Sequence, residues 1–471
     1  MKLHLLLAAL LMMTSLSPGA EAGAPIALHP ENPHYFHWRG QPVVIITSAE
    51  HYGAVVNRDF DYHKYLTTLA ADRMNYTRIF TGAYVEPQGA FKIERNTLAP
   101  EKGRFICPWA RSAEAGYANG GNKFDLTQWD PAYFARLKDF VSAASEKGVI
   151  VEVTLFCPMY EDMQWQLSPM NSTNNINGLG SVDKHAVHTL DRSGGLLAVQ
   201  EAMARKIVTE LNPMDNVIFE ICNEPYFGGV TMDWQHRIAD VIVETERGLP
   251  NRHLIAQNIA NKTAKIEKPH AAVSIFNFHY AAPPEAVSAN YHLNKVIGDD
   301  ETGFNGTGDT AYRTEGWDFI LAGGGLFNHL DYSFTAGQED GTFVYPPTQP
   351  GGGNAGFRRQ MKVLREFINS LDFIRMKPDN SVIKAGIPEG GSARTLVQAD
   401  RTIAVYLRCG KKGSGTAPLQ VELPKGRWQV EWIDPVSGKT SGKEKVEGGA
   451  VRAIKVPAYQ DDIALRMTRE N

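Results

Sequence analysis

Two carboxylic acids stand directly after apolar segments of the sequence. Glu224 follows the apolar run VIFEIC, and Pro225 ends any strand at that point. Glu301 closes the stretch NKVIGDDE, after Asp299 and Asp300. Burial beside a strand end should raise the pKa of Glu224 and keep this acid protonated near neutral pH. A protonated and an ionised carboxyl facing one cleft are the groups that hydrolyse glycosidic bonds.

Strand and helix patterns alternate over the residues that must position these acids. Apolar runs predict eight strands, at 43–47, 75–80, 149–156, 217–223, 253–258, 273–280, 294–301 and 324–333. Amphipathic runs predict helices at 130–148, where Asp130 can cap and Pro131 suits the first position, and at 194–211. Such buried strands separated by helices indicate a parallel sheet covered on both faces.

Eight strand–helix units predict the α/β class and a (β/α)₈ TIM barrel over residues 23–380. The alternative is an open doubly wound sheet, although no glycine-rich phosphate turn follows the first strand. A barrel would bring Glu224 and Glu301 to one rim, at the C-terminal ends of its fourth and seventh strands. Long loops at 81–129 and 157–193 would stand over that rim. Their aromatic and amide side chains suit a hydroxylated ligand, and we expect Trp109 to contact it unless these residues only pack the loops together.

Asn-Glu-Pro after the fourth strand and Glu-x-Gly after the seventh resemble clan A of the retaining glycoside hydrolases. That clan includes the family 5 cellulase-like enzymes. The resemblance implies that Glu224 is the acid/base, that Glu301 is the nucleophile and that Asn223 bonds the sugar 2-hydroxyl. It further implies a carbohydrate substrate and no cofactor.

Three other positions match the pattern of the clan. Arg78, in TRIF near the end of the second strand, resembles the clan's arginine beside the nucleophile, where a cation would keep Glu301 ionised. His279 and Tyr280 close the sixth strand and resemble its His-x-Tyr region, although here they are adjacent. The resemblance implies that the tyrosine orients the nucleophile and that the histidine contacts substrate.

Other rim segments are candidates for the sugar site. The first strand ends in SAEHY, which places Glu50 and His51 there. The eighth ends in HLDYSF, where Asp331 could bond hydroxyls and an aromatic replaces the tryptophan frequent in the clan. The third strand ends in LFCP, without the histidine that is usual in family 5.

Composition narrows the classes of partner. The chain has 471 residues and a formal net charge of −4, so it lacks the basic field that nucleic acid requires. Four scattered cysteines form no CxxC, and we expect no metal site. A disulfide between Cys107 and Cys157 stays open.

The first 22 residues read as a signal peptide. Lys2 is followed by an apolar core and then by AEA, a small-x-small cleavage site. We therefore expect a secreted or periplasmic protein. No later segment is long and apolar enough to span a membrane.

Residues 381–471 form a different pattern, of short strands without helices, which predicts a small all-β sandwich domain. It would act as a structural cap on the barrel or, with Trp428 or Trp432 exposed, as a carbohydrate-binding module. An alternative to an enzyme is that the whole chain is a secreted, non-catalytic glycan-binding protein. A carboxyl separation of about 5–5.5 Å between Glu224 and Glu301 would favour a retaining hydrolase.

Overall fold

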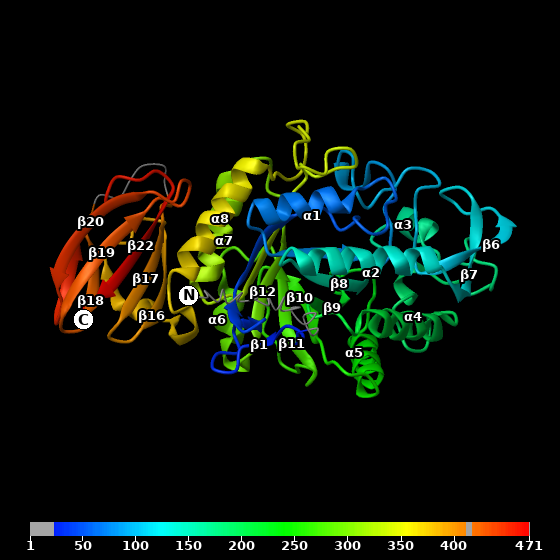
Figure 1. Cartoon of the computed structure of the whole chain (residues 1–471), viewed down its shortest axis with the longest axis horizontal. Helices are drawn as coiled ribbons and strands as arrows, with labels where there is room; N and C mark the ends of the chain where they lie inside the picture. Colours follow the sequence, from blue (N-terminus) through cyan, green and yellow to red (C-terminus); the bar gives the residue numbers. More distant parts are fainter. Residues whose placement is uncertain (1–22, 411–416, 471) are drawn as a thin grey trace, which may run out of the picture.

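The computed structural model of the chain describes residues 23–410 and 417–470. The predicted signal peptide, residues 1–22, lies outside the described residues. A central barrel is joined to a C-terminal β domain on one side and to an extended loop region on the other (Figure 1).

Eight parallel strands form the barrel, which confirms the predicted TIM fold. Their order in the sheet is β4-β13-β12-β11-β10-β9-β8-β5. The strands are β4 (Ile45–Ala49), β5 (Tyr76–Phe80), β8 (Ile150–Phe156), β9 (Val217–Cys222), β10 (Leu254–Asn261), β11 (Val273–His279), β12 (Val296–Thr302) and β13 (Leu326–Leu330). Each lies within a few residues of a predicted strand because continuous apolar runs are what a parallel sheet buried on both faces requires.

Side chains close the barrel between β4 and β5. Thr47 Oγ1 donates to the carbonyl of Tyr76 at 2.8 Å. The Asn75 side chain donates to the carbonyl of Val44 at 2.9 Å and accepts from the amide of Ile46 at 3.0 Å. These bonds join the first and last strands of the sheet order and leave no open edge.

Helices cover the outside of the barrel. They are α1 (Tyr62–Ala71), α2 (Pro131–Glu146), α4 (Leu196–Leu211), α5 (Met232–Arg247), α6 (Glu285–Asn290), α7 (Asp309–Leu321) and α8 (Ala355–Asn369), while the short α3 (Asp162–Leu167) lies in the loop after β8. The predicted start of α2 is confirmed: Asp130 accepts from the amide of Ala132, and Pro131 occupies the first turn.

A small antiparallel sheet closes the N-terminal end of the barrel. It comprises β1 (Ala27–Leu28), β2 (Phe36–Trp38) and β3 (Gln41–Val43), and its Phe36 and Trp38 pack against inward apolar side chains of the barrel strands. A tight hairpin joins β2 and β3, with Trp38 paired to Gln41. The run predicted as one strand from Val43 is divided, because the hairpin arm ends at Val43 and the barrel strand begins at Ile45.

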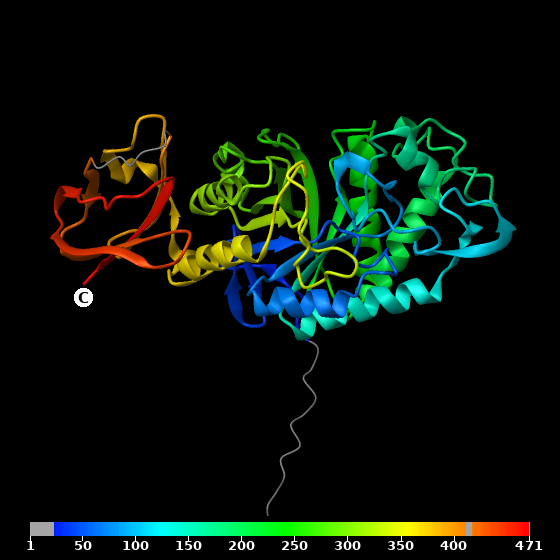
Figure 2. The same ribbon diagram turned by 90° about the horizontal axis from the view of Figure 1, so that it is seen from above.

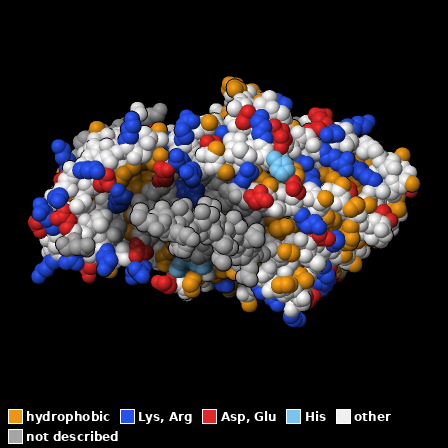
Figure 3. Space-filling view, in the orientation of Figure 1, with side chains coloured by type: hydrophobic (Ala, Val, Ile, Leu, Met, Phe, Trp, Pro, Cys, Tyr) orange, Lys and Arg blue, Asp and Glu red, His pale blue; other side chains and the backbone are white. Residues whose placement is uncertain are grey.

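The loop after β5 folds into its own hairpin, β6 (Trp109–Ala115) and β7 (Asn122–Trp129), which lies at the end of the molecule farthest from the C-terminal domain (Figure 1). Cys107 and Cys157 are both free thiols, so the disulfide left open by the sequence is not formed. None of the helices in the described ranges has the length and apolar character that crossing a bilayer needs. Basic and acidic side chains are interspersed on the face drawn in Figure 3.

Two sheets form the C-terminal domain. One contains β14 (Lys377–Pro378), β16 (Ser392–Gln398), β17 (Thr402–Arg408), β22 (Asp462–Arg469), β19 (Arg427–Ile433) and β20 (Thr440–Glu447). The other contains β15 (Ile383–Ala385), β18 (Leu419–Leu423) and β21 (Ala450–Ile454). Trp428 and Trp432 lie in the core between them, 0 and 1% exposed. The proposal that these tryptophans bind carbohydrate is therefore wrong, since alternation turns both of them inward.

The C-terminal domain packs on the barrel through α7 and α8 (Figure 2). Trp317 of α7 stacks on Tyr406 of β17, with ring centroids 5.4 Å apart. Beside them Arg313 donates to both carboxylate oxygens of Asp462, at 2.8 to 3.2 Å. A buried aromatic stack and a buried ion pair join the two parts, as expected of a structural cap.

Asp462→Ala should destabilise the protein by about 3 kcal/mol, because it leaves the buried Arg313 guanidinium without its main counter-charge. Urea unfolding followed by tryptophan fluorescence measures the loss. Glu422→Ala is the matched control, because it breaks an exposed ion pair with Lys384 and should leave the midpoint unchanged. Equal midpoints for the two variants would show that the ion pair does not hold the domains together.

Candidate active site

A cavity of about 700 Å³ opens at the C-terminal ends of the barrel strands. That volume lies in the range of small-molecule sites. Residues from several strand ends and loops line it, among them His51, Tyr84, Asn223, Glu224, Tyr280 and Glu301.

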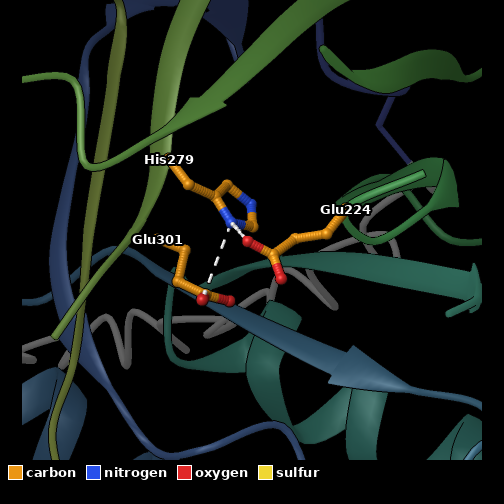
Figure 4. Close-up of side chains that lie close together, drawn as sticks. All are labelled: Glu224, His279 and Glu301. Carbon is orange, nitrogen blue, oxygen red and sulfur yellow. Dashed lines mark hydrogen bonds and ion pairs between the residues drawn. The ribbon is translucent and has the colours of Figure 1, made fainter. Parts of the chain in front are cut away.

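Glu224 and Glu301 face one another across this cavity with His279 between them (Figure 4). His279 Nδ1 lies 3.1 Å from Glu224 Oε1 and 3.6 Å from Glu301 Oε1. One oxygen of each glutamate and a nitrogen of His279 all lie within 4.8 Å of one another. The side chains of Glu224 and Glu301 are 10 and 7% exposed. Each acid is thus nearly enclosed, yet still reaches the cavity.

Hydroxyl groups hold both oxygens of Glu301. Tyr280 donates to Oε1 at 2.5 Å, and Tyr52 donates to Oε2 at 2.7 Å. Arg78 Nη1 lies 3.5 Å from the same Oε2. Two phenol donors and a guanidinium stabilise an ionised carboxylate and fix its orientation.

A bulge in β12 aims Glu301 into the cavity. Phe278 of β11 pairs with Asp299, but the next residue, His279, pairs with Glu301, so Asp300 is an extra residue in the ladder. The extra residue breaks the strict alternation of the strand, and both Asp300 and Glu301 then lie near His279. Neither Asp299 nor Asp300 lines the cavity, so Glu301 is the acid of this run that faces it.

Glu224 is held by two further tyrosines from the loops. Tyr160 donates to Oε2 at 2.6 Å, and Tyr226 donates to Oε1 at 3.1 Å. The backbone of Glu224 has a φ of 35°, and Tyr52 and Tyr280 have φ values of 62° and 53°. Left-handed conformations are unfavourable for residues with side chains, and such outliers concentrate at functional sites.

The pKa of Glu224 is lowered rather than raised, which corrects the expectation from the sequence. Burial alone would raise it, but hydrogen bonds from His279, Tyr160 and Tyr226 to the carboxylate outweigh burial. Burial lowers the pKa of His279, whereas the charges of Glu301 and Asp300 raise it well above its usual value. Both shifts favour a proton on His279 rather than on Glu224 in the unliganded protein.

Arg78 organises the residues beneath the two glutamates. It donates to Glu220 Oε2 at 2.5 and 2.8 Å and to Asn223 Oδ1 at 2.7 Å, and it lies 3.3 Å from Asp300. Burial would raise the pKa of Asp300, but Arg78 and His279 lower it. Asn223, whose Oδ1 is thus occupied, donates its amide nitrogen to Tyr160 at 2.8 Å.

The structure brings Arg78, Asn223, His279, Tyr280 and the two glutamates together, and His51 lines the same cavity, 3.5 Å from Glu86. Five predicted residues do not line it: Arg78 and His279, which contact the two glutamates from behind, and Glu50, Asp331 and Trp109.

Glu50 accepts from the backbone amides of Gly53 and Ala54 and so holds its own loop. Asp331 bonds Ser48 and Arg358. Trp109 packs in the core, 1% exposed. These three side chains therefore have structural roles, set by partners that are distant in the sequence.

Four residues of the site have contacts that the sequence did not indicate. Tyr160 and Tyr226 come from loops whose course no periodicity sets. Glu86 pairs with His51 at the cavity wall. Glu220 did carry a signal, because it is a lone acid inside the apolar strand VIFEIC and an inward position of a barrel strand needs a buried partner.

Two groups of three side chains have the spacing of metal ligands: Glu224 with His279 and Glu301, and Glu152 with Glu220 and Asp300. In the first, His279 contacts both glutamates, and Tyr160 and Tyr280 donate to them. In the second, Arg78 pairs with Glu220 and Asp300, and Asn277 donates to Glu152. The members of both groups therefore have protein partners within bonding distance.

Solved structures share this fold. A protein from Bacteroides vulgatus named as a candidate glycoside hydrolase superposes with a TM-score of 0.68 at 15% identity, covering 96% of this chain and 84% of that one. A glycoside hydrolase family 5 protein from the same organism gives a TM-score of 0.63 at 14% identity, covering 94% of each chain. No curated protein matches the sequence.

The family model of the cellulases, glycosyl hydrolase family 5, matches residues 40–293, which is more than half of the chain. The matched range includes Arg78, Asn223, Glu224, His279 and Tyr280 and stops just before β12. The barrel, the cavity at its rim and this match agree, and the chain is a glycoside hydrolase that belongs to family 5.

Proposed function

We propose that the protein hydrolyses the O-glycosidic bonds of an oligo- or polysaccharide or related glycoside with retention of configuration. The observation that carries the proposal is the pair Glu224 and Glu301, with oxygens within 4.8 Å of one another at the end of the cavity. Retaining enzymes hold their two carboxyl groups about 5–5.5 Å apart, whereas inverting enzymes leave about 6.5–9.5 Å for a water molecule.

In the first step Glu301 attacks the anomeric carbon and forms an ester, and the bond to the leaving oxygen breaks. The proton for that oxygen comes from the His279–Glu224 pair and is delivered through Glu224. Arg78, Tyr52 and Tyr280 hold the side chain of Glu301 aligned until the attack.

In the second step Glu224 accepts a proton from a water molecule, which attacks the anomeric carbon and releases Glu301. Formation of the ester removes the negative charge of Glu301, one of the charges that raise the pKa of His279. The pKa of the imidazole therefore falls while the ester forms, which favours transfer of its proton through Glu224 to the leaving oxygen in the first step. Glu224 thus acts first as an acid and then as a base. His279, 3.1 Å away, balances the change in its charge by releasing and then regaining a proton.

A screen of aryl glycosides and of plant, algal and microbial polysaccharides should identify a substrate, and proton NMR of the first product should show the anomer of the substrate. The opposite anomer would contradict the two-step mechanism. Binding of one glycan without hydrolysis anywhere in the screen would favour a non-catalytic glycan-binding protein.

We further propose that the protein is exported, which rests on the residues Lys2 to Ala22 of the sequence. Expression of the full chain in a bacterial host should give a mature protein whose N-terminal sequence begins near Gly23. A protein that keeps Met1 and stays in the cytoplasm would contradict export.

A further inference from the structure

Three exposed phenylalanines surround the mouth of the cavity. Phe91, Phe227 and Phe304 line it and are 40, 44 and 41% exposed. Among the described residues no other phenylalanine is exposed to this degree. A phenyl ring has no hydrogen-bonding group, so each ring leaves apolar surface in water, and three of them around one cavity mark a binding surface.

Two of these rings lie on the side of the acid. Phe91 and Phe227 contact the ring of Tyr160, with centroids 5.6 and 5.9 Å away, and the Tyr160 hydroxyl donates to Glu224. Phe304 lies between the two sides, because its ring centroid is 6.4 Å from that of Phe91 and 6.2 Å from that of Tyr280, which donates to Glu301. Because the acid must reach the leaving oxygen, the group that leaves lies beside Phe91 and Phe227.

The backbone around Phe91 is held in an unfavourable conformation. Phe91, Lys92 and Arg95 have φ values of 54°, 63° and 51°. Arg95 is tied to the opposite loop, where it donates to the Gln338 side chain and to the carbonyl of Ala336. Left-handed conformations at three residues with side chains persist only where the surrounding structure enforces them, and here they present a ring to the cavity.

Two polar residues next to each other in the chain, Asn261 and Lys262, also line the cavity. The Oδ1 atom of Asn261 accepts from the Tyr226 hydroxyl at 2.5 Å. We propose that the leaving-group side of the cleft binds an apolar aglycone, an alkyl or aryl group, in preference to a further sugar unit. This inference rests on the proposed function and specifies the substrate class of the same site.

The first test compares methyl and octyl glycosides of the sugar that the wild type accepts, below the micelle concentration of the octyl compound. A fully buried methylene favours binding about fourfold, so partial burial of the chain should raise kcat/KM at least about tenfold. Phe91→Ser and Phe227→Ser should bring the octyl-to-methyl ratio close to one. Ile387→Ser, which removes a side chain 45% exposed in the C-terminal domain, should leave the ratio at its wild-type value.

A binding experiment separates this inference from the proposed function. Calorimetry of Glu301→Gln with methyl and octyl glucosides, in both anomeric forms, needs no turnover. Tighter binding of an octyl glucoside, lost on adding Phe91→Ser, would support the apolar subsite even if no hydrolysis were found. Equal affinity for methyl and octyl compounds would overturn it. So would an oligosaccharide that is cleaved faster than the octyl glycoside and is unaffected by Phe91→Ser.

Discussion

Glu301→Gly should lower kcat/KM at least about 10⁴-fold, because the variant lacks the atom that forms the covalent intermediate. Azide should restore turnover of an aryl glycoside by entering the vacated space and attacking the anomeric carbon directly. The product would be a glycosyl azide of inverted configuration. In Glu224→Ala, azide should instead attack the ester to Glu301 and give the retained configuration. Rates and NMR of the two azide products therefore assign both roles.

Asp299→Asn is the matched control for the nucleophile. Asp299 stands two residues away on the same strand, and burial together with the nearby Glu315 raises its pKa well above the usual range. The neutral amide therefore resembles the protonated acid, and kcat/KM should stay within about fivefold of the wild type. If Asp299→Asn loses as much activity as Glu301→Gly, and azide does not rescue Glu301→Gly, then Glu301 is not the nucleophile.

The barrel and the pair Glu224 and Glu301 could be predicted from the sequence because both depend on patterns of neighbouring residues. Val217–Cys222 is apolar apart from Glu220, and Asn223 and the acid Glu224 follow its end. Which acid of Asp299, Asp300 and Glu301 enters the cavity was not local information. It depends on a bulge that is defined only by pairing with β11. The resemblance to a known family chose Glu301, and the geometry supplies the physical reason.

Long-range partners account for what could not be predicted. The pKa of Glu224 was expected to rise because a strand end implies burial, but its donors Tyr160 and His279 come from a different loop and a different strand. Trp109 looked like a ligand contact because it lies in a loop, yet it begins the β6–β7 hairpin and packs in the large core that also contains barrel residues. The residue type determines which reactions and bonds a side chain can form. Its partners in the folded chain determine which of these it forms.

Arg78→Met should lower stability and activity together. The variant leaves Glu220, Asp300 and Glu301 without the guanidinium that lies 2.5, 3.3 and 3.5 Å from them. Removing one partner of a buried ion pair costs about 3–5 kcal/mol, and kcat/KM should fall at least about 10³-fold because Glu301 loses its cation. Arg104→Met breaks an exposed pair with Asp59 and should change neither quantity measurably.

The pH dependence distinguishes a charge effect of Arg78 from a loss of packing. In the wild type the folded-state pKa of Asp300 is lowered, so this group adds stability above its unfolded pKa, and that stability is lost as the pH falls through the folded value. Arg78→Met removes this contribution. The difference in unfolding free energy between the two proteins should therefore be largest near pH 7 and shrink below about pH 4, where the unfolded carboxyls become protonated. A difference independent of pH would mean that Arg78 acts by filling space. Arg78→Lys, which keeps the charge without the planar fork, should recover part of the stability but little of the activity.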